Sequence, residues 1–217
     1  EMITDLTTNG WSSNSDDIFI RTRPNIIYNK MVHPIRNYSI SGFLWYQGEA
    51  NAGSAIDSAQ YRFTLPSFIT EYRERFDQGD LPFLGVQLPS FNQANWPLFR
   101  ESQDQMETLD NAYAAVTIDT GLANNIHPTD KEPIGIRLSR LARKFALNEN
   151  IEALSPRFDT MTVTGNSVEL SFINDAGLAT DDGNAPATFE IAGANQVYHA
   201  ATSSSVSRRV VTISSTS

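Results

Sequence analysis

The sequence contains no cysteine, and this absence removes several kinds of chemistry at once. Without a thiol the chain cannot form a disulfide, hold a metal through thiolates or use a cysteine nucleophile. The absence does not decide a compartment, because it fits a bacterial protein in any of them.

Long apolar runs and an excess of positive charge are also missing. No run of about 18 apolar residues is present, so the sequence predicts no membrane partner. The net charge of −9 argues against nucleic acid as a partner, because the phosphates would be repelled. No signal peptide is visible at Glu1. Because Glu1 is not an initiator methionine, we expect the natural start to lie upstream.

What is present is enough apolar material for a core: 40% of the 217 residues are hydrophobic. Apolar runs alternate with amphipathic stretches, and this order predicts a parallel sheet with helices packed on it. Runs without polar alternation predict strands that are buried on both faces. The predicted strands span residues 39–46, 81–88 and 113–119, and the predicted helices span residues 25–38, 61–76, 97–109 and 133–147.

Composition changes after about Ser155, where helix signals stop. Alternating apolar residues around a Gly165-Asn166 turn predict antiparallel strands. We therefore divide the chain into an α/β part (1–155) and a β-rich part (156–217), with a polar loop over residues 1–24. Further strands of the β-rich part are predicted over residues 188–191, 196–200 and 206–213.

Polar residues follow each predicted strand of the α/β part. Gln47-Gly48-Glu49 follows the first strand, Gln87 and Ser90 follow the second, and Asp119 and the segment 124–128 (NNIHP) follow the third. Ligands of parallel α/β sheets bind at the carboxyl ends of the strands. The sequence therefore predicts a binding site at this edge.

The chain has three histidines, and a hydrolase with a nucleophile and a base needs one of them as the base. His127 lies in a strand-to-helix loop, so it is either this base or an ordinary loop residue. For His33, on the first predicted helix, we favour packing or capping. His199 lies in the β-rich part, and we expect no catalytic role for it.

Three other side chains at the predicted edge have both a chemical and a structural explanation. Glu49 either orients and charge-stabilises His127 or supplies charge to a helix N-terminus. Gln47 either donates its amide to a developing oxyanion or is a satisfied core amide. Asp119 either pairs with the histidine or caps the next turn.

Four stretches, in this order, resemble a known family: IIYNKMVHPIRNYSISGFLWYQGEANA, YRFTLPSFITEYRERF, GDLPFLGVQLPSF and NNIHPTDKEPIGIRLSRLA. They are similar to the sialate O-acetylesterases and related carbohydrate acetylesterases of the SGNH hydrolase superfamily. The similarity extends over about residues 24–147. It implies a flavodoxin-like three-layer α/β/α domain, here incomplete, and the β-rich tail is similar to the segment that follows that domain in the sialate-esterase branch.

The resemblance implies hydrolysis of acetyl esters on sugars by a Ser-His-acid mechanism, with no cofactor and no metal. It assigns the base to His127, the oxyanion-hole amide to Gln47 and the triad acid to Glu49. Relatives are often exported, which implies a periplasmic or extracellular bacterial location. Either acetylated sialic acid or an acetylated plant polysaccharide fits as the substrate.

The chain departs from the family pattern in two ways. Asn124 and Asn125 stand where many members carry an aspartate before the histidine; an asparagine can orient the imidazole but brings no charge. The early G-x-S segment of the nucleophile is absent, and the serines at positions 12, 13 and 15 lie in a polar loop. We therefore expect the nucleophilic serine outside this chain. We also expect the chain to be stable only with the missing N-terminal segment or with another copy.

Two alternatives remain at this point. One is a catalytically silent carbohydrate-binding module of the same fold, in which Trp45, Tyr46, Phe91 and Trp96 stack on sugar rings or simply pack. The other is a structural or interaction fragment, which would leave His127 and Glu49 far apart.

Overall fold

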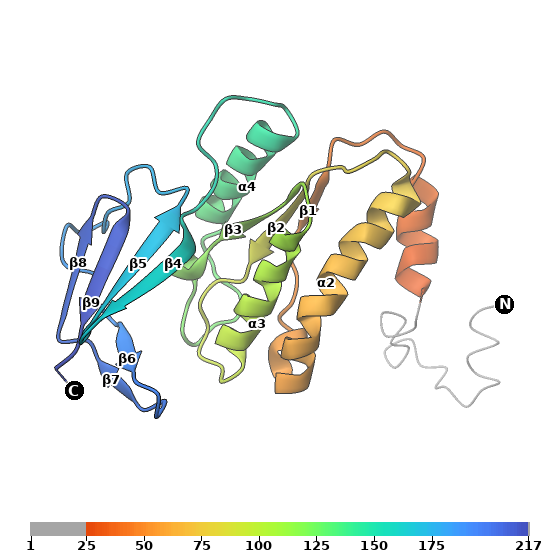
Figure 1. Ribbon diagram of the computed structural model, residues 1–217. Helices are drawn as coiled ribbons and strands as arrows, with labels where there is room; N and C mark the ends of the chain where they lie inside the picture. The colour runs from red at the N-terminus through yellow and green to blue at the C-terminus, as the bar shows by residue number, and fades with distance from the viewer. Residues whose placement is uncertain (1–24, 217) are drawn as a thin grey trace, which may run out of the picture.

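The protein's structure is a computed structural model that describes residues 25–216 (Figure 1). The predicted loop over residues 1–24 lies outside the described residues. The α/β part is built on a parallel sheet in the order β1-β2-β3. Its strands are β1 (Phe43–Trp45), β2 (Phe83–Gln87) and β3 (Ala112–Val116). The predicted parallel sheet with packed helices is confirmed.

Helices cover both faces of this sheet (Figure 1). One face packs against α2 (Ala55–Phe76), α3 (Trp96–Asp104) and the 3₁₀ helix η6 (Gln105–Thr108). The other face packs against α4 (Glu132–Phe145). These layers place the carboxyl ends of the three strands at one edge, where their connecting loops meet.

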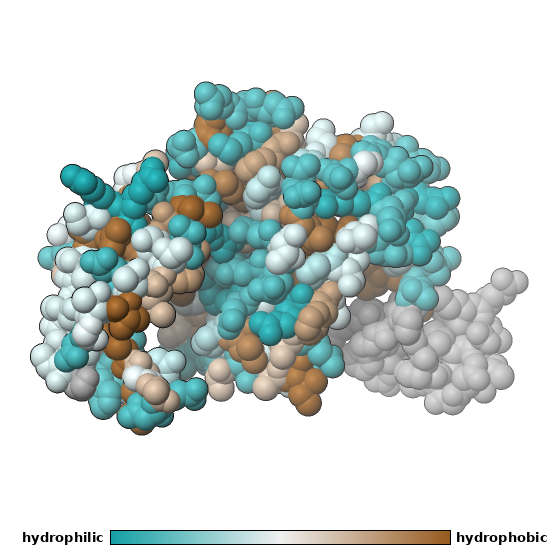
Figure 2. All heavy atoms as spheres, viewed as in Figure 1, coloured by the Kyte–Doolittle hydropathy of each residue, from teal (hydrophilic) through white to brown (hydrophobic). Residues whose placement is uncertain are grey.

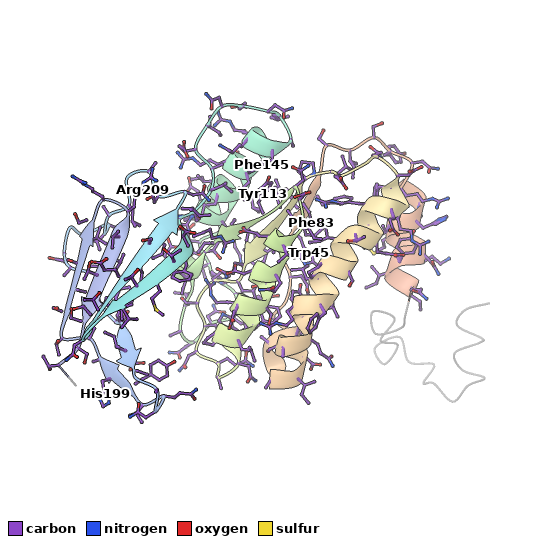
Figure 3. The ribbon with its side chains drawn as sticks, viewed as in Figure 1. Trp45, Phe83, Tyr113, Phe145, His199 and Arg209 are labelled. Atoms are coloured by element: carbon purple, nitrogen blue, oxygen red, sulfur yellow. The ribbon has the colours of Figure 1, made fainter. Side chains whose placement is uncertain are left out.

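Alternating side chains of the strands supply the two cores. Phe83 points into the core with α2 and α3, whereas its neighbour Leu84 points into the core with α4. On that second face Tyr113 stacks on Phe145, with ring centroids 3.5 Å apart (Figure 3). All five residues of β2 are buried, so the prediction of a strand buried on both faces is confirmed for β2.

The first strand differs from its prediction. Of the apolar run 39–46, only the three residues Phe43–Trp45 form a strand, and Leu44 is 64% exposed. Within the described residues β1 is an edge strand, and α4 does not extend over it. The prediction that β1 is buried on both faces was therefore wrong for the face that carries Leu44. That the chain needs another segment or a second copy stays a prediction.

The long helix α2 begins one residue after Ser54, whose hydroxyl accepts a hydrogen bond from the backbone N–H of Asp57 (3.0 Å). This contact satisfies one of the free donors at the helix start. The helix continues through Pro66 and ends at Asp77, which adopts a left-handed conformation (φ 52°). The predicted helix over residues 61–76 is thus confirmed and begins earlier than expected.

Short helical turns complete the α/β part. The segment predicted as a helix over residues 25–38 is a π-helix followed by a 3₁₀ turn that contains Pro34. The turns are η3 (Tyr28–Val32), η4 (His33–Ile35), η5 (Asn51–Gly53) and η7 (Ile118–Thr120).

The β-rich part contains two antiparallel sheets, with orders β4-β5-β9-β8 and β6-β7. Residues 206–213, predicted as one strand, instead form a hairpin that turns at Arg208 and Arg209. In Figure 2, small apolar patches interrupt the polar surface of this part. Its strands are β4 (Arg157–Thr164), β5 (Ser167–Ile173), β6 (Glu190–Ala192), β7 (Tyr198–Ala200), β8 (Ser203–Ser207) and β9 (Val210–Ser214).

A charged cluster joins the two parts at the start of β4. Arg157 donates to Asp104 (2.9 Å) and pairs with Glu107. Glu107 also accepts a hydrogen bond from the backbone N–H of Ala114 in β3 (2.7 Å). The first β-rich strand is therefore attached to the parallel sheet. Among the described residues, no helix combines the length and apolarity needed to cross a bilayer.

Candidate active site

The loop after β1 carries Gln47, whose side-chain amide is bonded on both sides. Its Oε1 accepts from the Tyr61 hydroxyl in α2 (2.9 Å), and its Nε2 donates to Asn51 Oδ1 in η5 (2.9 Å). The Tyr61 oxygen in turn accepts from the indole N–H of Trp45 (3.2 Å). The side chain of Gln47 is therefore held at the end of the strand.

Gly48 lets this loop lie directly on α3. Its φ is +145°, and a Cβ at this position would overlap the ring of Phe99. The buried side chain of Gln103 holds the loop from below, because its Nε2 donates to the carbonyls of Gln47 (3.3 Å) and Val86 (3.1 Å). Its Oε1 accepts from the backbone N–H of Leu88 (2.8 Å). The loop after β1 is thus bound to the end of β2.

Glu49 is half-buried beside this amide. Its carboxylate makes no hydrogen bond and no ion pair with any residue of the range 25–216. Its charge nevertheless acts on Tyr61: burial raises the pKa of that phenol, the Trp45 hydrogen bond lowers it, and the charge of Glu49 raises it further. Glu49 is therefore a carboxylate without a bonding partner among the described residues, close to the amide of Gln47.

The loop after β3 carries His127 on its surface. Asn125 Oδ1 accepts from the backbone N–H of His127 (2.9 Å), and the backbone N–H of Asn125 donates to the carbonyl of Leu122 (3.2 Å). The imidazole is exposed and makes no hydrogen bond or ion pair within the described part of the chain. Asn124 is also exposed. The contact of Asn125 therefore shapes the backbone, and its effect on the imidazole stays a prediction.

Three contacts bring the strand-end loops together. Gly121 lies so close to the backbone of Ser90 that a Cβ there would overlap it. The backbone N–H of Asn92 donates to the carbonyl of Ala123 (3.0 Å). Lys131 Nζ donates to the Tyr46 hydroxyl (2.9 Å) and lies 4.7 Å from the centroid of that ring.

These contacts place the loops of Gln47 and His127 in one neighbourhood. They do not join the imidazole to Glu49 by a direct bond, so the pairing of the two side chains stays a prediction. Among residues 25–216, no group of three or more histidine, aspartate or glutamate side chains is arranged to hold a metal ion.

Asp119 forms an ion pair with Arg137. Its carboxylate accepts two hydrogen bonds of 2.6 Å from Arg137 in α4, and this contact holds the pKa of Asp119 below its usual range. Arg137 also donates to the carbonyl of Val116 (2.7 Å). Asp119 therefore secures the start of the loop through an ion pair with α4, which neither of its two explanations had predicted.

Gln87, expected at the open strand end, is instead buried under α3. Its amide donates to Asp104 (2.8 Å) and accepts from Arg100 (2.7 Å), and Arg100 also donates to the carbonyl of Leu88. Burial lowers the pKa of Arg100, which the charges of Asp104 and Asp119 offset in part. Gln87 thus stabilises the base of the site.

The other two histidines make no contact with Gln47, Glu49 or His127 among the described residues. His33 is exposed in η4 and makes an edge contact with the ring of Tyr28 (6.1 Å between centroids). His199 is exposed in β7, and Figure 3 places it in the β-rich part, far from Trp45.

The aromatic residues considered for sugar stacking are mostly committed to packing. Trp96 is 3% exposed and donates its indole N–H to the carbonyl of Pro89 (2.7 Å). Trp45 packs on Phe68, with centroids 4.5 Å apart. Phe91 lies against Trp96 (5.2 Å). These contacts weaken the interpretation as a silent sugar-binding module.

Sequence reasoning missed the side chains that hold Gln47. Tyr61 appears in the sequence only as a member of the apolar stripe of a helix, and Asn51 only as a loop residue. Gln103 lies 56 positions from Gln47. A tyrosine among aliphatic residues on a buried face was the one available signal, because a buried hydroxyl needs a partner.

The fold and this edge define a class: a parallel α/β protein whose site lies where the strands end. A family model described as carbohydrate esterase, sialic acid-specific acetylesterase, matches residues 8–146, and the chain belongs to this family. The family predicted from the sequence motifs is thereby confirmed.

Individual relatives agree with the family. Sialate O-acetylesterases of Mus musculus and Homo sapiens are 32% and 30% identical to this chain. These matches cover 59% and 62% of the chain, and 27% and 29% of the relatives. A crystal structure of a carbohydrate acetylesterase from Xanthomonas citri superposes with a TM-score of 0.84 at 31% identity. It covers 98% of this chain and 49% of its own, so the β-rich part is shared. The chain spans less than a third of the curated relatives it matches and about half of this solved one.

Proposed function

We propose that the full-length protein carrying this sequence is a carbohydrate O-acetylesterase that removes acetyl groups from sugars such as sialic acid. The observation that carries the proposal is the Gln47 amide, held on both sides at the same sheet edge as the exposed imidazole of His127. Membership of the sialic acid-specific acetylesterase family supports the substrate class.

In this proposal a serine from outside the described residues attacks the acetyl carbonyl, and His127 takes the serine proton. The resulting imidazolium then gives that proton to the sugar oxygen as the carbon–oxygen bond breaks. Water attacks the acetyl-serine in the second half of the reaction while His127 takes its proton. The imidazolium returns that proton to the serine oxygen as the acyl–oxygen bond breaks, and acetate leaves. The exposure of the imidazole supports this role, because the group is free to face both serine and substrate.

Gln47 is the proposed oxyanion donor. A side-chain amide stabilises the tetrahedral intermediate when its N–H is already aimed at the site, because no reorganisation is then needed during the reaction. Two hydrogen bonds of 2.9 Å already fix this side chain. They support a preorganised donor rather than a flexible one.

Glu49 is the proposed acid of the triad. It is an uncommitted carboxylate in the loop of Gln47, whereas Asp119 is bonded to Arg137. The mechanism requires the carboxylate of Glu49 and the imidazole of His127 to meet. Catalytic hydrogen bonds are often long before substrate binds and tighten in the complex.

The experiment measures hydrolysis of p-nitrophenyl acetate and of O-acetylated sialic acid by the full-length protein. His127→Ala should lower kcat/KM by about 100-fold or more, as expected for a lost general base. His199→Ala, an exposed histidine in β7, serves as the matched control and should retain activity. Full activity in the His127 variant would rule out the proposal.

A second pair of variants separates the two candidates for the group that orients the imidazole. If Glu49 is the triad acid, Glu49→Gln removes most activity and Asn125→Asp in that background does not restore it. Recovery in the double variant would instead assign the position to residue 125. We also propose a periplasmic or extracellular location for the protein, which fractionation of the native cells tests.

A further inference from the structure

A row of four hydrogen-bonded side chains runs beneath the end of β1. It starts at the indole of Trp45, passes through the hydroxyl of Tyr61 and the amide of Gln47, and ends at Asn51. The successive donor–acceptor distances are 3.2, 2.9 and 2.9 Å. The four residues come from β1, α2, the loop after β1 and η5, so the row depends on the fold as a whole.

The bonds of this row share one direction, from Trp45 towards Gln47, and meet the Gln47 amide with a donor on its oxygen and an acceptor on its nitrogen. An indole N–H can only donate, so the Tyr61 oxygen accepts from Trp45. The single hydrogen of the phenol is then available for a neighbouring acceptor, and the structure places Gln47 Oε1 there at 2.9 Å. The NH₂ group of Gln47 then faces Asn51 Oδ1 and donates one hydrogen bond to it. Its second N–H has no acceptor among the described residues and is available to a ligand.

The phenol keeps the proton on which this direction depends. Tyr61 is 6% exposed, and its ring lies 4.6 Å from that of Phe99. Burial raises the pKa of Tyr61; the Trp45 hydrogen bond opposes this in part, and the charge of Glu49 adds a smaller increase. The hydroxyl is therefore a donor across the pH range in which an ester hydrolase works.

We infer that Tyr61 is a positioning residue for ester hydrolysis, with Asn51 as its counterpart: together they hold the Gln47 amide so that one N–H points to the developing oxyanion. Without the hydroxyl the amide can rotate by a half turn, which would present its oxygen to a negative charge. This inference rests on the proposed function. In it, Tyr61 and Asn51 act on the reaction only through the Gln47 amide and do not contact the substrate.

The test is Tyr61→Phe in the full-length protein with p-nitrophenyl acetate as substrate. Phenylalanine keeps the ring against Phe99 and removes only the hydroxyl. We expect kcat to fall about 10-fold, less than the roughly 100-fold loss of an oxyanion donor itself, with KM within two-fold. Tyr72→Phe makes the same change on the same helix, at a hydroxyl with no hydrogen bond among the described residues, and should leave kcat unchanged.

A double-variant cycle separates positioning from a purely structural effect. Because Tyr61 acts through Gln47, Tyr61→Phe should have no further effect on kcat in a Gln47→Ala background. Equal losses in both backgrounds, or an unchanged kcat in the single variant, would overturn the inference. If Tyr61→Phe folds poorly, Asn51→Ala removes the other partner of the amide, and the same cycle with Gln47→Ala applies to it.

The outcomes also separate this inference from the function on which it rests. An active His127→Ala variant overturns the proposed function. An inactive His127→Ala variant together with a fully active Tyr61→Phe variant overturns the positioning role alone.

Discussion

The two loops that carry the candidate site are built in opposite ways. The loop after β1 is bound from below and from both sides, through Gln103, Tyr61 and Asn51. The loop after β3 holds His127 by one side-chain contact to its backbone and leaves the imidazole exposed. The difference fits the proposed roles, because an oxyanion donor gains from being fixed beforehand, whereas a base must face two partners in turn.

The sharpest way to test this contrast is to add one methyl group to the tight loop. Gly48→Ala would force a Cβ into the ring of Phe99 at a φ of +145°, so we expect the free energy of unfolding to fall by about 3 kcal/mol. Gly53→Ala, in the same segment, meets no atom within 4 Å and should change it by less than about 0.5 kcal/mol. Urea unfolding of the full-length protein measures both, and equal values would show that the loop is not tightly packed.

The second prediction removes the bonds beneath the same loop. Gln103→Met keeps the size of the side chain but leaves the carbonyls of Val86 and Gln47 and the N–H of Leu88 without this partner. Unmet buried polar groups cost about 1–3 kcal/mol, and we expect a loss of about 2 kcal/mol in the same urea experiment. The control is Gln105→Met in η6, where the amide makes no hydrogen bond among the described residues. A loss below that of the control would contradict the role of Gln103.

The contrast between the loops also explains how far sequence reasoning reached. For β2 the apolar run correctly predicted a buried strand, because every residue from Phe83 to Gln87 faces a covering helix. The run around Leu44 had the same composition, yet Leu44 is exposed, because burial of an edge strand depends on which elements lie beside it. The turn at Arg208 was missed since it carries no glycine, proline or asparagine, although Arg208 has a positive φ (56°).

The same limit applies to the site. Gln47 and His127 were identified by their place after a strand and by family motifs, which are local properties of the sequence. The bonds of Gln47 to Tyr61 and Gln103 join positions 14 and 56 residues apart, and no local pattern contains them. Whether Glu49 meets the imidazole depends on two loops at once, and this pairing stays a prediction.

The third prediction concerns the anchor at the start of the looser loop. Because Arg137 holds the pKa of Asp119 below its ordinary value of 3.8, the charged pair stabilises the fold above that value. The stabilisation is lost as the pH falls through the depressed pKa. Asp119 is 58% exposed, so we expect at most about 1 kcal/mol. Urea unfolding of wild type and Asp119→Asn should differ at pH 6 and converge towards pH 3. The control is Asp159→Asn, which removes an exposed carboxylate that has no ion pair within residues 25–216. A difference that grew on acidification would contradict the ion pair.

The smallest effect is expected at the histidine loop itself. Asn125→Ala removes the acceptor of the His127 backbone N–H, but this group is exposed and can bond water instead. We therefore expect the free energy of unfolding to change by less than about 0.5 kcal/mol, close to the value for Asn124→Ala. Hydrogen exchange at the His127 amide should nevertheless become faster, because its protein acceptor is gone. A stability loss comparable with that of Gly48→Ala would mean that both loops are equally fixed, and the contrast between a tightly bound amide and an exposed base would fail.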